Sequence, residues 1–161
     1  MRTHNKINQI FGVALVATLA VALPLEAHHS FAMYDVQKTK VVTGVVTRVD
    51  PSVNHLQIFF AVMNEERTNV ERDAAGDPIV WSVEMAGSGT MARQGVTVNT
   101  YPPGTVFSVG LHPLRNGEPA GARVGGLFKC PERTPPDPGK HCDSVAGHTA
   151  VGDEPLASPA E

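Results

Sequence analysis

The alternation of apolar and polar residues predicts short strands through the middle of the chain. The segment 79–85 reads IVWSVEM, with Trp81 and Val83 on one face and Ser82 and Glu84 on the other. A period of two is typical of a half-buried strand. Other short runs that are rich in β-branched or apolar residues lie at 40–49, 56–63, 106–111 and 122–128. Turn residues separate these five runs, which indicates an antiparallel barrel or sandwich.

One segment predicts a helix instead. Residues 88–95 read SGTMARQG, where Ser88 can cap the first turn and Gly95 can end the helix. This helix falls between the third and fourth predicted strands, which is the order of an OB-fold. Gly44, inside the first run, suits the bend that a small barrel needs. We therefore predict a mostly β fold, a small five-stranded OB-like barrel with one short helix between strands 3 and 4. A plain β-sandwich is the alternative.

The start of the chain has the layout of a secretory signal peptide. Arg2 and Lys6 precede an apolar run at 10–23, and Ala27 offers a small residue for cleavage. The run has about 14 residues, whereas a membrane span needs roughly 20. Residues 1–27 are therefore expected to be removed, and the mature protein to be periplasmic or secreted. An uncleaved membrane anchor is the alternative.

The remaining chain divides into four expected parts. These are an N-terminal arm at 28–39, the barrel at 40–128, a cysteine-bounded loop at 129–142 and a flexible tail at 143–161. The tail is predicted flexible because glycine, alanine, proline, serine and acidic residues dominate it. The whole chain carries a net charge of −3. It has no basic patch, and phosphate contacts need clustered Lys and Arg, so nucleic acid is not an expected partner.

The two cysteines, Cys130 and Cys142, are expected to form a disulfide. An even pair in an exported chain is typical of disulfide bonding. The alternative is a metal site that also uses His141, but no C-x-x-C pair supports it.

Four histidines are the candidate metal ligands. Cleavage after Ala27 would leave His28 and His29 at a new amino terminus. His55 follows the first predicted strand and His112 the fourth, and in an OB-fold the loops after these strands lie on one side of the barrel. Imidazole suits copper, zinc and nickel, and an amino terminus with imidazoles suits copper in particular. Copper is therefore the expected cofactor if any metal binds. The alternative is that His55 and His112 are surface residues with no ligand role.

The motifs of common enzymes are incomplete. Ser30 follows His29 without a G-x-S-x-G context, and Gly125-Gly126 has no helix after it. We therefore expect a protein that is not an enzyme.

Several segments together resemble a family of small exported bacterial proteins of unknown function. They read HHSFAMYD, TGVVTRVDPSVNH, VWSVEM and PPGTVFSVGLHPLRNGEPAG, within residues 27–128. Members of the family typically start the mature chain with His-His-Ser-Phe. The positions that match its motifs are His28, His29, His55, Trp81, Glu84, His112, Pro113, Arg115 and Gly117. The usual Asn-Pro-His is Val53-Asn54-His55 here, and the usual aspartate after Pro-Gly is Thr105. The resemblance implies export and a small β-barrel, and it carries no established activity.

Three functions follow as hypotheses. The first is an exported, non-enzymatic binding module for a transition metal, copper first, with Asn54 and Arg115 as binding-loop residues beside the histidines. The second is an envelope module that binds a protein or a glycan, with incidental histidines. The third is a copper-dependent oxidative enzyme, which a domain this small disfavours because it offers little surface for a substrate.

Overall fold

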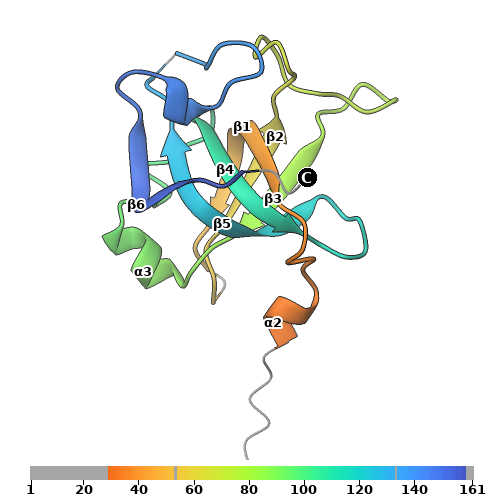
Figure 1. The fold of residues 1–161 in the computed structure, drawn as a ribbon, viewed down its shortest axis with the longest axis vertical. Coiled ribbons are helices and arrows are strands. Elements are labelled where there is room, and N and C mark those ends of the chain that lie inside the picture. Colours follow the sequence, from red (N-terminus) through yellow and green to blue (C-terminus); the bar gives the residue numbers. More distant parts are fainter. Residues whose placement is uncertain (1–28, 53, 133, 159–161) are drawn as a thin grey trace, which may run out of the picture. The chain divides into compact units, whose positions relative to one another are not determined.

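The computed structural model describes residues 29–52, 54–132 and 134–158, and its strands form a closed barrel (Figure 1). The compact unit that contains all of the strands begins at Phe31. The elements in chain order are α2 (His29–Ala32), β1 (Lys40–Asp50), β2 (Gln57–Val62), β3 (Val80–Glu84), α3 (Ser88–Arg93), β4 (Val106–Pro113), β5 (Ala120–Lys129), η1 (Cys142–Ser144) and β6 (Thr149–Leu156). None of the described helices has the length and apolar character that a membrane crossing needs.

Five strands close the barrel, and a sixth, β6, pairs with the second half of β5. The strand order is β3-β2-β1-β4-β5-β6, and a parallel pairing of β3 with β5 joins the two sides. α3 lies between β3 and β4 in the chain. The prediction of a five-stranded, mostly β barrel with one short helix in this position is therefore confirmed.

The core follows from the alternation in the sequence. Inward positions on successive strands supply Val42, Ile58, Val83, Phe107 and Leu127, all at most 5% exposed. Met85 and Met91 are buried in the same core. Both therefore pack in the barrel interior.

Gly44 is required where β1 passes over a phenylalanine ring. A Cβ atom at Gly44 would lie 2.4 Å from Phe60 Cδ2 and 2.8 Å from the Ala61 carbonyl oxygen. The Phe60 ring in turn packs edge-on against Phe107, with the ring centroids 5.1 Å apart. The absence of a side chain at Gly44 thus lets an aromatic cluster fill the barrel interior.

The C-terminal part of the chain is more ordered than the sequence predicts. Cys130 and Cys142 form the expected disulfide, and both are buried. In place of the expected flexible tail, residues 149–156 form β6, which pairs antiparallel with β5. Val151 on β6 is 4% exposed and belongs to the barrel core. The disulfide and this apolar contact order a segment whose composition favours flexibility.

Candidate functional site

A histidine, a carboxylate and a tyrosine form a chain of hydrogen bonds on the barrel surface. Glu84, the last residue of β3, uses both of its carboxylate oxygens. Its Oε1 bonds to His55 Nδ1, and its Oε2 accepts from the Tyr34 hydroxyl at 2.9 Å. These residues come from the loop before β2, the end of β3 and the N-terminal arm. The barrel therefore gathers groups that lie 29 and 50 residues apart in the chain.

The bonds define which nitrogen of His55 is available. An ionised carboxylate only accepts hydrogen bonds, so Nδ1 carries the proton in this pair. In the neutral ring, Nε2 then has the free lone pair. The His55 side chain is 45% exposed, and that of Glu84 is 22% exposed. The arrangement holds an imidazole at a fixed orientation with one nitrogen free to accept a proton, a hydrogen bond or a metal ion.

Tyr34 remains a hydrogen-bond donor over a wide pH range. Burial raises the pKa of its phenol first, and the hydrogen bond to Glu84 and the charge of Glu84 raise that pKa further. The Tyr34 side chain is nearly fully buried, at 4% exposed. Tyr34 therefore anchors the arm on the barrel.

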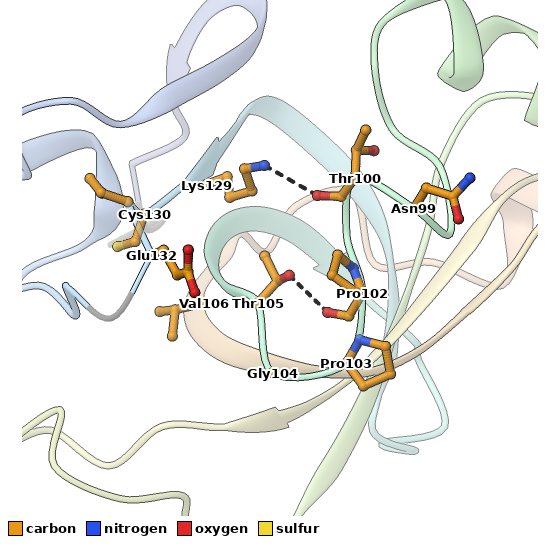
Figure 2. Close-up of a pocket in the computed structure, with 11 residues that line it drawn as sticks. Asn99, Thr100, Pro102, Pro103, Gly104, Thr105, Val106, Lys129, Cys130 and Glu132 are labelled. Carbon is orange, nitrogen blue, oxygen red and sulfur yellow. Dashed lines mark hydrogen bonds between the residues drawn. The ribbon is translucent and has the colours of Figure 1, made fainter.

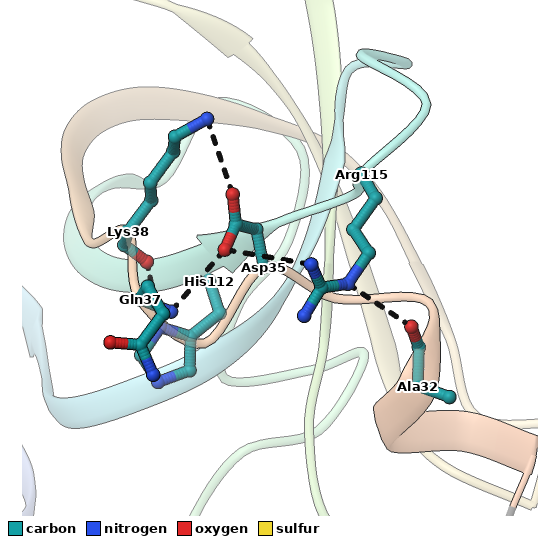
Figure 3. Close-up of polar contacts among 6 residues, drawn as sticks. All are labelled: Ala32, Asp35, Gln37, Lys38, His112 and Arg115. Atoms are coloured by element: carbon teal, nitrogen blue, oxygen red, sulfur yellow. Dashed lines mark hydrogen bonds and ion pairs between the residues drawn. The ribbon is translucent and has the colours of Figure 1, made fainter.

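Further polar contacts tie the arm to the end of β4 (Figure 3). Asp35 pairs with Lys38 at 3.2 Å and lies 3.9 Å from Arg115. The Arg115 side chain donates to the Ala32 carbonyl at 3.2 Å. The hydrogen bond with Lys38 is the main cause that lowers the pKa of the Asp35 carboxyl below its ordinary value. Arg115, expected as a binding-loop residue, is thus engaged in holding the arm.

His112 belongs to this arm contact. Its Nδ1 lies 2.8 Å from the Lys38 carbonyl oxygen (Figure 3). A carbonyl oxygen only accepts, so Nδ1 is the donor and Nε2 again has the lone pair in the neutral ring. Both barrel histidines are therefore fixed through Nδ1.

The strand register relates these two histidines. Ala122 on β5 pairs with Glu84 on β3 and with His112 on β4. Paired residues share a face, and adjacent strands lie about 4.8 Å apart. The backbones of Glu84 and His112 are therefore roughly 10 Å apart across one face. His55 bonds to Glu84 and His112 to the arm, so the two rings belong to separate hydrogen-bond networks.

The parts of the chain that the structure describes contain no group of three or more His, Cys, Asp or Glu side chains that could hold a metal ion. Of the predicted ligands, His28 lies outside the described residues, and only the backbone of His29 is described, at the start of α2. Asn54 is exposed in the loop before β2. The role of the terminal histidine pair thus stays a prediction.

The partners of His55 were not predicted from the sequence. Glu84 is an outward strand position by alternation, and Tyr34 is an aromatic residue of the arm. Both lie in segments that carry the family resemblance, VWSVEM and HHSFAMYD. A polar residue that ends a strand beside a loop histidine was the signal that could have linked Glu84 to His55.

A separate groove lies at the disulfide end of the barrel (Figure 2). It has a volume of about 530 Å³ and lies between the loop at 99–105 and the segment 129–132. Lys129 donates to the Thr100 carbonyl at 3.1 Å, and its ammonium lies 5.4 Å from the centre of the Tyr101 ring. Lys129 is thus engaged with the groove wall, and no predicted ligand histidine is among the described residues that line the groove.

Comparison with known proteins places the barrel in a family. A model described as "Family of unknown function (DUF6152)" matches residues 15–123. The chain belongs to this family. The match spans β1 to β4 and the first part of β5, and it includes His55, Glu84 and His112. No curated protein and no solved structure gave a match. Membership in the family assigns no activity, so the function rests on the geometry of the site.

Proposed function

We propose that the protein is an exported, non-enzymatic binding module for a transition-metal ion, copper first, with His55 as its main ligand on the barrel. The observation that carries this proposal is the Glu84–His55 hydrogen bond. Histidines that bind metal typically donate their other ring N–H to a carboxylate or a carbonyl, which fixes the ring and raises its basicity. Glu84 is held in turn by Tyr34, so the imidazole has a supported orientation.

Further donors come from the sequence. One imidazole nitrogen does not make a metal site, and His28, His29 and the amino group exposed by cleavage would add nitrogen donors of the kind that copper prefers. His112 is the other barrel histidine whose Nδ1 is fixed and whose Nε2 has a lone pair. In this proposal these groups complete the shell around an ion that His55 anchors.

Export is supported by two observations. The first 27 residues have the layout of a signal peptide. The Cys130–Cys142 disulfide is compatible with an oxidising compartment outside the cytoplasm. An exported location also fits a module that meets copper before it enters the cell.

The proposal is tested by titrating copper(II) into protein that begins at His28, with isothermal calorimetry. We expect one equivalent to bind. His55→Ala removes the main donor and should weaken binding at least tenfold. Glu84→Gln keeps the shape but loses the charge that orients the ring, and loss of such a partner weakens binding by about 10- to 100-fold.

The matched control is His148→Ala. His148 bonds through Nδ1 to the Val145 carbonyl in the C-terminal segment, far in sequence from the site. It should leave copper affinity unchanged. Affinity that is unchanged in His55→Ala as well would overturn the proposal, because uptake would then belong to other groups.

The second candidate, a module that binds an envelope protein, is favoured by the arm. Phe31 is 68% exposed, Met33 48% and Val36 45%. Three exposed apolar side chains within six residues are typical of a contact surface. Changing all three to serine should abolish capture of a protein partner from an envelope extract and leave copper binding intact. If the triple variant still captures the partner, this second candidate is contradicted and the metal proposal alone is favoured.

A further inference from the structure

A second hydrogen-bond chain runs between the barrel and the C-terminal segment, away from His55. The Cys142 backbone N–H donates to Ser108 Oγ at 2.8 Å. Ser108 Oγ lies 2.7 Å from Thr43 Oγ1, which lies 2.8 Å from His141 Nδ1. Ser108 and Thr43 are 0% and 1% exposed. These hydrogen bonds therefore join β4 and β1 to His141 and to Cys142, the second cysteine of the disulfide.

The direction of these bonds follows from the only fixed donor. Because the Cys142 N–H can only donate, Ser108 accepts from it. If His141 is neutral with its proton on Nε2, then Ser108 donates to Thr43, and Thr43 donates to His141 Nδ1. Each hydroxyl then donates once and accepts once. The neutral imidazole thus gives both buried hydroxyls, Ser108 and Thr43, a full set of partners.

Protonation of His141 breaks this order. Both ring nitrogens of a charged imidazole are donors, so Nδ1 would donate to Thr43. A hydroxyl oxygen has two lone pairs, so Thr43 would then either donate to Ser108 or accept from both His141 and Ser108. In the first case the Ser108 hydroxyl proton loses its acceptor, in the second case the Thr43 hydroxyl proton does, and both residues are buried. A buried donor without a partner is strongly unfavourable, so the charged form opposes the closed arrangement.

The charges around His141 reinforce this effect. Burial is the main cause that lowers the pKa of His141, the Arg67 guanidinium lowers it further, and Asp143 opposes them. Arg67 is held nearby by a bond from its Nε to the Lys140 carbonyl at 3.0 Å. A second groove, separate from the one in Figure 2, lies beside Thr43 and Arg67. Lys40, Glu65 and Glu71 also line it. Among these groups, Arg67 is the cation that acts on the ring.

We propose that His141 is an acid-sensitive latch that holds the C-terminal segment, residues 142–158, on the barrel. Protonation releases the Cys142 N–H from Ser108 and loosens η1 and β6. The disulfide to Cys130 keeps the released segment attached. Release of β6 frees the second half of β5, Gly125–Lys129, with which β6 pairs. An unpaired strand edge is a site where another strand can add, so acid would expose a new surface. His141 and this segment lie beyond the residues that match the family, whereas Thr43 and Ser108 lie within them.

Amide hydrogen exchange of the full mature protein tests the latch. After correction for intrinsic exchange rates, residues 142–158 should exchange at least fivefold faster at pH 5 than at pH 7. His141→Gln cannot be protonated, so in that variant the rates at the two pH values should agree. Equal acceleration in the wild type and in His141→Gln would overturn the proposal.

His148→Gln is the matched control within the same segment. His148 Nδ1 lies 2.8 Å from the Val145 carbonyl, which can accept from the neutral or the charged ring. Its protonation breaks no bond, so His148→Gln should keep the wild-type response to acid. Loss of the response in this variant would move the switch to His148 and contradict the proposal.

A measurement on the unaltered protein keeps the inference testable if His141→Gln does not fold. Nitrogen-15 chemical shifts distinguish the two neutral tautomers of histidine. The latch requires the proton of neutral His141 on Nε2, and requires His141 to titrate below the ordinary histidine range. A proton on Nδ1 at neutral pH would contradict the proposed direction of the chain.

Discussion

Tyr34 shows how one side chain connects distant parts of the chain. Its hydroxyl bonds to Glu84, 50 residues away, while its ring is buried between the arm and the barrel surface. The same carboxylate orients His55. Glu84 therefore contributes to both the arm position and the imidazole orientation, and a change in Tyr34 acts on both.

Replacing Tyr34 with phenylalanine should separate the contribution of the hydroxyl bond to Glu84 from that of the buried ring. The ring stays buried, but Glu84 loses one donor. A hydrogen bond to a charged group contributes about 1.5–3 kcal/mol, and water can reach the partly exposed Glu84, so we expect a loss of about 1 kcal/mol in the free energy of unfolding. Urea denaturation at pH 7 measures this loss. Lys38→Ala, which removes an exposed ion pair with Asp35, is the control and should cost less stability than the change in Tyr34.

His141 predicts a dependence of stability on pH. Its pKa is lowered in the folded protein, mainly by burial. The unfolded chain therefore binds more protons at mildly acidic pH, and the free energy of unfolding falls as the pH falls through the ordinary histidine pKa of about 6.5. Urea denaturation between pH 7.5 and 5.5 should show this decline, and His141→Gln should reduce its slope. An identical slope in the variant would contradict the assignment. The pKa values of Asp35 and Asp50 are lowered as well, and these carboxyl groups change the free energy of unfolding only at lower pH.

Sequence reasoning found the histidines of the site and missed their partners. His55 and His112 could be placed near one side of the barrel because strand order sets where loops lie. The bonds from Glu84 to His55 and from Thr43 to His141 join residues 29 and 98 positions apart. No spacing rule in a single sequence specifies such pairs, because they depend on strand register and on the path of the arm.

At the scale of elements, composition predicted the barrel strands well and the last strand badly. β1 to β5 alternate or carry β-branched residues, so their local preference and their place in the fold agree. β6 contains glycine, proline and two acidic residues, which disfavour a strand. It forms because β5 offers an unpaired edge, Val151 enters the core and the disulfide keeps the segment close.

The close contact at Gly44 makes a sharp prediction for β1. Gly44→Ala would place a methyl group against the Phe60 ring and the Ala61 carbonyl oxygen. Overpacking of a filled core costs about 1–3 kcal/mol, so we expect a loss in that range by urea denaturation. Gly89→Ala is the matched control, because Gly89 is exposed in α3 and a Cβ there meets only Arg93 Nη1 at 3.8 Å. That change should stabilise by up to about 1 kcal/mol. A Gly44→Ala protein as stable as the wild type would show that β1 has room for a methyl group.

At the scale of the whole molecule, the proposed metal site and the proposed latch use different residues. The matched residues hold His55, Glu84 and His112, and the residues beyond them hold both cysteines and His141. The proposed latch also uses Thr43 and Ser108, which lie within the matched residues but take no part in the proposed metal site. A failure of one leaves the other standing, because no residue takes part in both.

The terminal histidines join the barrel site only if one ion binds to both, and a double-variant cycle tests this. Adding one glycine before His28 moves the free amine by one residue and should weaken copper binding, and His55→Ala should weaken it too. If both changes disturb one shell, their combined effect on the binding free energy is smaller than the sum of the separate effects, because the first change already disrupts the site. Calorimetry should also show one equivalent of copper, whose binding weakens in acid because protons compete with the ion for the imidazole nitrogens. Additive effects with two equivalents of copper would place the terminal pair and His55 in separate sites, and the terminal pair would then bind copper independently of the barrel.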